Sequence, residues 1–148
     1  MSFTPVANSK FYIGTQKPCS AAADYASDTY IQILGINSVG DFGDQAEEIK
    51  FQTIDNARVN KLKGPRDAGN FDLTVGFLSA DAGQIAMRAA AADNGLPFNF
   101  KAVLADGTTR YLTGLVMSAQ SVNGEANAVQ REKYSIALTA APLVAAAA

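Results

Sequence analysis

The stretch NFDLTVGFLSADAGQIAMRAAAADNG, residues 70–95, contains the two periodicities that decide the fold. Between residues 70 and 77 every second residue is apolar, which is the period of a strand with one buried face. Between residues 79 and 94 alanines and an isoleucine recur at spacings of three and four, which is the period of a helix. A strand followed at once by one alanine-rich helix predicts a β-rich domain against which a single helix packs.

The ends of this helix carry recognisable signals, so we predict that it spans about residues 79–94. Ser79 is a favourable N-cap, and Asp81 falls in the first turn, where the helix dipole stabilises an anion. Asn94 and Gly95 end the helix, with the glycine supplying a positive φ. The face expected to pack on the sheet is a narrow stripe of mostly small residues: Ala82, Ile85, Ala86, Ala89 and Ala92.

The segment that follows the helix predicts an antiparallel meander. PFNFKAVLADGTTRYLTGLVMSA (97–119) reads as a hairpin around Asp106-Gly107, a preferred pair for a type I′ turn. A second turn at Asn123-Gly124 leads into VQREKYSIALTA (129–140), where apolar and polar residues alternate. The fold class is therefore mainly β, a sandwich or barrel of antiparallel strands with one packed α-helix at about residues 79–94.

The N-terminal half predicts further strands and one long loop. KFYIGT (10–15) and TYIQILGI (29–36) are β-rich, and AEEIKFQTI (46–54) alternates between apolar and polar residues. Residues 54–70, IDNARVNKLKGPRDAGN, contain glycine, proline and cations but little apolar period. We predict a long loop there, and loops of that length in a compact domain usually have a function or are disordered.

The composition excludes most catalytic chemistry. The chain has no histidine, so it contains no Ser–His or Cys–His pair and no histidine metal site. Its one cysteine, Cys19, cannot form an internal disulfide, and we interpret it as structural or incidental. An enzyme is the least favoured class, and we predict no catalytic residue, no cofactor-binding residue and no metal ligand.

Two charged segments stand out in a chain whose 14 acidic and 12 basic residues give a net charge of −2. The basic segment holds Arg58, Lys61, Lys63 and Arg66, and the acidic segment holds Asp41, Asp44, Glu47 and Glu48. Binding of nucleic acid to the outside of the protein is weakly indicated, because no aromatic residue is interleaved with the cations. Either both segments are simply solvated, or they complement each other between copies in a head-to-tail assembly.

Nothing in the sequence predicts a membrane partner. The longest uncharged stretch, SIALTAAPLVAAAA (135–148), has 14 residues and contains Pro142. About 20 apolar residues are needed to span a bilayer. We expect this segment to be a flexible or partner-docked tail, and the N-terminal MSFTPVANSK shows no signal-peptide pattern.

The order of these elements resembles a known family. GPRDAGNFDLTVGF (64–77) is followed by SADAGQIAMRAAAADNG (79–95), PFNFKAVLADGTTRYLTGLVMSAQ (97–120) and VQREKYSIAL (129–138). This order is similar to that of the major tail tube protein of siphophages, the viruses with long non-contractile tails. The resemblance covers roughly residues 45–141, and it depends on order and spacing because none of the motifs is catalytic.

The resemblance implies one tail-tube domain over residues 1–148, with an N-terminal arm at 1–12, the long loop at 54–70 and a C-terminal tail at 141–148. Copies would form hexameric rings that stack into a hollow tube through which DNA passes without specific binding. The loop, with the two charged segments, would contact the next ring, and the arms would wrap neighbouring subunits. The partners would be further copies and the tape measure, terminator and distal tail proteins. The protein would be made in the bacterial host cytoplasm and reside in the virion tail.

A tube for DNA also implies a neutral or acidic lumen, because a cationic wall would grip phosphates. Asp72 and Thr74, on the polar face of the strand at 70–77, are the candidates to line it. Two alternatives stay open. One is a tail terminator or baseplate hub subunit of similar fold, and the other is a small β module that binds a ligand.

Overall fold

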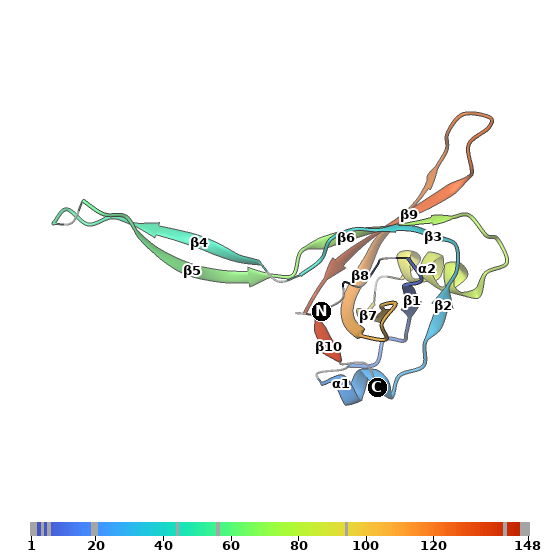
Figure 1. Cartoon of the computed structure of the whole chain (residues 1–148), viewed down its shortest axis with the longest axis horizontal. Helices are drawn as coiled ribbons and strands as arrows, with labels where there is room; N and C mark the ends of the chain where they lie inside the picture. The colour runs from blue at the N-terminus through green and yellow to red at the C-terminus, as the bar shows by residue number, and fades with distance from the viewer. Residues whose placement is uncertain are drawn as a thin grey trace.

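The computed structural model describes residues 3, 5, 7–18, 21–43, 45–55, 57–93, 95–140 and 142–145. Its helices and strands follow one another as shown in Figure 1. They are β1 (Lys10–Ile13), α1 (Ala22–Ala26), β2 (Ile31–Ile33), β3 (Ile36–Val39), β4 (Gln45–Phe51), β5 (Asn60–Asp67), β6 (Asn70–Gly76), α2 (Ala82–Ala92), β7 (Phe98–Val103), β8 (Thr109–Val122), β9 (Arg131–Leu138) and β10 (Leu143–Ala145). The structure confirms a mainly β fold with antiparallel sheets and few helices.

The main sheet has the strand order β2-β1-β7-β8-β9-β6-β3, with β10 paired to the beginning of β8. All of its pairings are antiparallel. The two ends of this order, β2 and β3, are consecutive in the chain and are joined by Leu34 and Gly35 alone. Because two residues bridge both ends of the sheet, the sheet must curl back on itself like a barrel. Gly35 allows the sharp change of direction with a φ of +78°.

The core lies inside this curl and is built from alternate residues of the strands. In β6 and β9 every second side chain is buried, as the sequence predicts for residues 71–75 and 134–138. Three phenylalanines from different strands meet at its centre, with the rings of Phe11 and Phe71 6.1 Å apart and those of Phe11 and Phe100 6.0 Å apart. Burial of such aromatic rings is among the largest apolar contributions to stability.

Helix α2 packs against β8, β2 and β1, but through a different face from the predicted one. Its buried residues are Gly83, Gln84, Met87 and Ala90, whereas Ile85 on the predicted stripe is 49% exposed. Gly83 lies so close to β2 that a Cβ there would come within 2.3 Å of the Gln32 carbonyl oxygen. The orientation of the helix is therefore determined by a close backbone approach and by a buried polar residue. Neither feature can be predicted from the spacing of apolar residues in the sequence.

The helix ends also differ from the prediction. Asp81 is the N-cap, rather than Ser79, and its Oδ2 accepts a hydrogen bond from the Gln84 backbone N–H at 3.0 Å. At the other end Asp93 is an extended C-cap. The predicted end at Asn94 lies outside the described residues.

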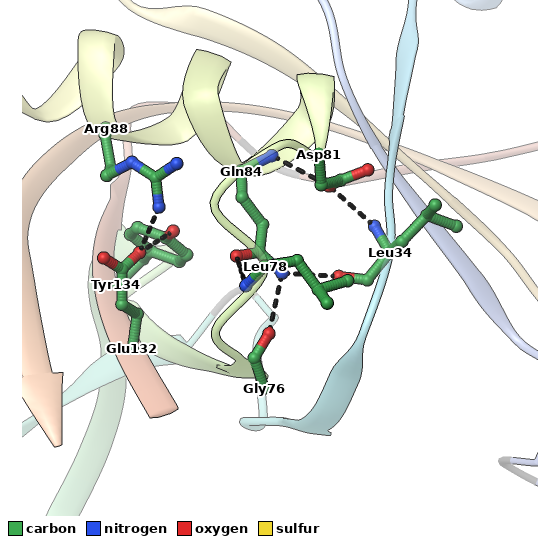
Figure 2. A network of polar contacts seen from close by, with 8 residues as sticks. All are labelled: Leu34, Gly76, Leu78, Asp81, Gln84, Arg88, Glu132 and Tyr134. Atoms are coloured by element: carbon green, nitrogen blue, oxygen red, sulfur yellow. Dashed lines mark hydrogen bonds and ion pairs between the residues drawn. The ribbon is translucent and has the colours of Figure 1, made fainter. Parts of the chain in front are cut away.

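The side chain of Gln84 forms hydrogen bonds with backbone groups from several parts of the fold (Figure 2). Its side-chain Nε2 donates to the carbonyl oxygens of Leu34 and Gly76, both at 2.8 Å, and its Oε1 accepts from the Leu78 N–H at 2.9 Å. One fully buried side chain thereby joins the β2–β3 link, the end of β6 and the start of α2. Such a group is stabilising because all of its hydrogen bonds are made inside the protein.

A second buried polar group ties α2 to β9. Arg88 Nη1 lies 3.0 Å from Glu132 Oε2, and the Tyr134 hydroxyl donates to the same oxygen (Figure 2). Burial first, and then the neighbouring Glu132 carboxylate, raise the pKa of Tyr134 above its ordinary value. The tyrosine therefore stays protonated as the donor that the carboxylate needs.

The predicted meander β7-β8-β9 is present, with different turns. At Asp106-Gly107 the Gly107 N–H donates to the Leu104 carbonyl at 3.0 Å. Gly107 has a φ of +94° and Asp106 a negative one, so the connection is a type I turn with a glycine bulge rather than type I′. The β8–β9 connection spans residues 123–130, and its turn is closed by the Ala128 N–H on the Glu125 carbonyl, beyond the predicted pair Asn123-Gly124.

The predicted long loop at 54–70 is wrong for about half of its length. Residues 60–67 form strand β5, which pairs with β4 in a separate two-stranded sheet that extends away from the main sheet (Figure 1). Gly64 and Pro65, which indicated a loop, lie in β5 where the pairing register shifts between Ala46 and Glu48. A two-stranded sheet accepts a proline there because one side of each strand has no partner.

The predicted terminal arms are in part strands as well. Phe11, inside the predicted arm 1–12, is a core residue of β1, and Leu143–Ala145, inside the predicted tail 141–148, form β10 on the edge of β8. The remaining residues of both segments are described only in part. Cys19 lies outside the described residues, and the short helix α1 was not predicted. Its Tyr25 is buried and stacks on Tyr111 at 5.3 Å between ring centroids.

Candidate assembly surfaces

The first surface is the β4–β5 hairpin, which the described part of the chain leaves exposed. Every residue of β4 and all but one of β5 are exposed. An isolated two-stranded hairpin is at best marginally stable in water, and strands normally need a covered apolar face. The hairpin therefore has the properties of a segment that packs against another molecule.

The pairing register gives this hairpin two different faces. Ile49 pairs with Leu62, and with Phe51 they form an apolar face on which the three side chains are 43%, 62% and 59% exposed. We call these three residues the apolar face of the hairpin. The opposite face is charged and holds Glu48, Lys50, Lys61 and Lys63. Exposed apolar side chains that gather on one face are typical of a protein–protein contact.

The predicted inter-ring residues divide between this hairpin and its base. Glu47 and Glu48 lie in β4, while Lys61, Lys63 and Arg66 lie in β5. Lys61 Nζ is 3.6 Å from Glu48 Oε1, so the acidic and basic segments partly neutralise each other within one chain. Arg58 lies near the hairpin tip, Asp41 lies in the link before β4, and Asp44 is outside the described residues. Sequence reasoning missed the apolar face, although the alternation of Ile49 and Phe51 with polar residues was its signal.

Glycines connect the hairpin to the main sheet on both sides. Gly43 before β4 has a φ of +152°, and Gly69 after β5 has a φ of +79°. An added Cβ would meet no atom within 4 Å at either position, so these glycines are required by backbone conformation and not by crowding. Gly69 is also held by the main sheet, because its carbonyl accepts a hydrogen bond from the Leu138 N–H at 2.9 Å. The two glycines therefore mark where the chain leaves the main sheet for the hairpin and where it returns.

The second surface is the outer face of the four strands β8-β9-β6-β3, on the side opposite the core. We call it the polar wall. It includes both candidate lumen residues, Asp72 and Thr74, beside the neighbouring residues Ser38, Ser118, Gln120, Arg131, Lys133 and Ser135. Asp72 Oδ2 lies 3.4 Å from Lys133 Nζ, and both side chains are about half exposed. Among the described residues of this wall, one carboxylate faces two cations, so the wall is not acidic.

The polar wall is open at both of its edges. β3 pairs with β6 and with no other described strand. At the other edge β7 pairs with β8 only as far as Gly114, so that residues 115–122 of β8 have a described partner strand, β9, on one side only. Unpaired edges are normally a hazard for β proteins and are also the means by which sheets join.

The described residues contain no cluster of three or more histidine, cysteine, aspartate or glutamate residues arranged to hold a metal ion. A groove of about 870 Å³ lies between the N-terminal segment, β3 and the β7–β8 turn. Within the described part of the chain, no helix has the length and apolar character to cross a bilayer.

Comparison with known proteins gives a consistent picture of the fold. No family model and no curated protein matches the sequence. A solved sheath/tube terminator of the PVC extracellular contractile injection system matches with a TM-score of 0.73 and 14% identity, over 99% of both chains. The SPP1 tail tube matches with a TM-score of 0.63 and 16% identity, over 95% of this chain and 78% of the other. The tail of a gene transfer agent particle, determined with C6 symmetry, matches with a TM-score of 0.63 and 16% identity, over 92% and 96%.

These proteins define the class of fold. Each is a component of a tail or tail-like tube, and the present chain shares the tail-tube fold with them. Contractile and other tails both occur among them, so the fold does not separate the two kinds.

Proposed function

We propose that this chain is a structural subunit of a phage tail of the long non-contractile kind. Its copies join edge to edge into rings, and the rings stack into a hollow tube through which DNA leaves the capsid. The shared tail-tube fold supports this role, as does the sequence resemblance to siphophage tail tube proteins.

The open edges of the polar wall are the observation that carries the proposal. Neighbouring strands in the wall are antiparallel, and the wall has an even number of strands. When copies are related by rotation about a common axis, β3 of one copy therefore meets β8 of the next with opposite direction. Every such junction continues an all-antiparallel sheet, and closure of the ring leaves no edge unpaired.

The diameter expected for this ring is large enough to enclose a DNA duplex. Six copies, as in the C6 symmetry of the gene transfer agent tail, make a barrel of 24 strands from the four-stranded wall. At about 4.8 Å between strands, its backbone is about 37 Å across, and strand tilt widens it further. The polar wall lines this channel, which puts Asp72 and Thr74 in the lumen.

The β4–β5 hairpin supplies the contact between rings. It extends beyond the main sheet (Figure 1). Its apolar face is left exposed by the described part of the chain. The charged residues on the rest of the hairpin orient this contact: Arg58, Lys61, Lys63, Arg66, Glu47 and Glu48. Asp41 lies in the link before β4, and Asp44 is outside the described residues. Tape measure, terminator and distal tail proteins meet the ends or interior of the tube.

A terminator subunit is the second candidate function. The match to the PVC sheath/tube terminator has a TM-score of 0.73 and covers almost all of both chains. A terminator forms one ring and stops, whereas a tube subunit continues to stack.

Negative-stain electron microscopy and light scattering over a concentration series test the proposal. Stacked rings of uniform width are expected for the tube subunit, and single rings that never stack support the terminator. The variant Val39→Pro places a proline in the edge strand β3, beside Gly40, whose N–H donates to the Asp72 carbonyl of β6. Because successive N–H groups of a strand point in opposite directions, the N–H of Val39 faces the free edge, and a proline there blocks an added strand. It should remain folded by circular dichroism and form no rings. Normal rings from this variant would contradict edge-to-edge joining.

A further inference from the structure

The polar wall contains a charge arrangement that the tube role leaves unexplained. Lys133 lies on β9, between Thr74 on β6 and Gln120 on β8. Arg131 is two residues away on the same face, about 7 Å along the strand. Two neighbouring cations on an exposed sheet make a binding surface for a polyanion, because each released counterion adds to the affinity.

Asp72 is the single carboxylate among the described residues of this wall. Its Oδ2 lies 3.4 Å from Lys133 Nζ, across the pair of strands β6 and β9. The aspartate does two things to an approaching phosphate. It occupies the lysine ammonium, and its own charge repels the phosphate at a distance well within the ~10 Å screening length of a 0.1 M salt solution.

We propose that Asp72 prevents the polar wall from binding the phosphate backbone of duplex DNA through Lys133. This inference rests on the proposed function, because it assigns the wall to the lumen. Counted over the described residues of the wall, loss of the carboxylate changes the net charge from +1 to +2 in each copy. The same change is repeated in every subunit around a ring and along a stack, so a weak single contact becomes strong retention of a strand.

The ion pair does not need to be strong for this role. Exposed pairs of this kind contribute little to folding stability, typically below about 1 kcal/mol. The variant Asp72→Asn should therefore fold and assemble normally. Its effect should appear in affinity for a polyanion, which separates this role from a structural one.

The test measures binding of a fluorescent 30-base-pair DNA duplex to the full-length protein by anisotropy, across a series of salt concentrations. Asp72→Asn is compared with the wild type and with Asp55→Asn, an exposed site near the hairpin tip that gives the same change in net charge. We expect Asp72→Asn to bind at least threefold more tightly than Asp55→Asn. The slope of log affinity against log salt should steepen by about 0.9 for each added phosphate contact.

The double variant Asp72→Asn/Lys133→Gln identifies the cation. It should return the affinity to the wild-type value. Equal affinities for Asp72→Asn and Asp55→Asn would overturn the proposal, because net charge alone would then explain the change. A double variant that stays as tight as Asp72→Asn would also overturn it, since Lys133 would not be the contact.

The assay remains informative if the tube role fails. Electron microscopy of the same variants reports ring formation independently. Tighter binding by Asp72→Asn in a protein that forms no rings would support the masking of Lys133 and refute the channel. Normal tubes without a difference in DNA affinity would support the tube and refute the masking.

Discussion

Replacement of Leu62 by threonine tests which face of the β4–β5 hairpin contacts a second copy. Leu62 is 62% exposed in the isolated subunit. Complete burial of a leucine contributes about 1.5–3 kcal/mol, so about 1–2 kcal/mol is still available to a partner at this residue. Leu62→Thr removes most of that contribution and keeps a β-branched residue in the strand. The concentration of unassembled subunit at equilibrium should rise roughly 5- to 30-fold.

The matched control is Lys63→Thr, which introduces the same residue one position further along the same strand, on the charged face. Exposed charges contribute little at moderate salt, so its effect should stay below about threefold. The assay is sedimentation of assembled material, followed by measurement of the protein left in solution at 0.15 M salt. A larger effect from Lys63→Thr than from Leu62→Thr would refute the reasoning and assign the contact to the charged face.

Three further predictions concern the subunit itself. Gly83→Ala should lower the free energy of unfolding by up to about 2 kcal/mol, because overpacking against the Gln32 carbonyl costs about 1–3 kcal/mol and helix propensity returns about 1 kcal/mol. Denaturant unfolding checks the sign, with Ala89→Gly as the propensity control. Gln84→Leu should lower the free energy of unfolding by at least about 2 kcal/mol, since it leaves the backbone partners of three buried hydrogen bonds unsatisfied. An unchanged free energy of unfolding in the same assay would contradict the importance of these hydrogen bonds. Burial opposes the ionised form of Asp28, but hydrogen bonds from Thr15, Asn99 and Thr29 outweigh it and lower the pKa of the carboxyl group. Asp28→Asn should therefore destabilise the folded protein at pH 7, and progressively less as the pH falls below about 4. An equal loss of stability in thermal unfolding at pH 7 and at pH 3 would contradict this.

The sequence predicted those elements whose side chains report directly on burial. Strand β6 alternates strictly, and β9 does the same in its second half, so both could be placed with the correct buried face. The order of strand, helix and three-stranded meander followed from these periods and from the turn at Asp106-Gly107. Their pairing across the sheet also follows, because consecutive antiparallel strands usually lie side by side.

The packing of α2 could not be predicted in the same way. Its position was correct, but its buried face is defined by Gly83 and Gln84, one without a side chain and one polar. Each is buried for a reason that depends on other elements, the backbone of β2 for the glycine and three backbone groups for the glutamine. The spacing of apolar residues in a sequence predicts only the apolar part of such a packing face.

The β4–β5 hairpin was missed because its signals conflict. Gly64 and Pro65 normally interrupt a strand, and the surrounding cations indicate solvent. These signals were correct about exposure and wrong about regular structure. The sequence singled out the charges around them as candidates, and their role stays a prediction. It did not single out the apolar face, because Leu62 stands between two lysines and joins an apolar face only through its pairing with Ile49. The ion pair of Asp72 with Lys133 likewise depends on a cross-strand register that the sequence does not contain.

The glycines at the base of the hairpin have a mechanical consequence. If hairpins join the rings in the proposed way, each hairpin leaves its main sheet at Gly43 and rejoins it at Gly69, and these two residues set the direction in which it leaves. A side chain at either position would force a different φ and would turn the hairpin toward another part of the neighbouring ring. In such a tube the spacing and rotation between rings would therefore depend on two residues that touch no other subunit.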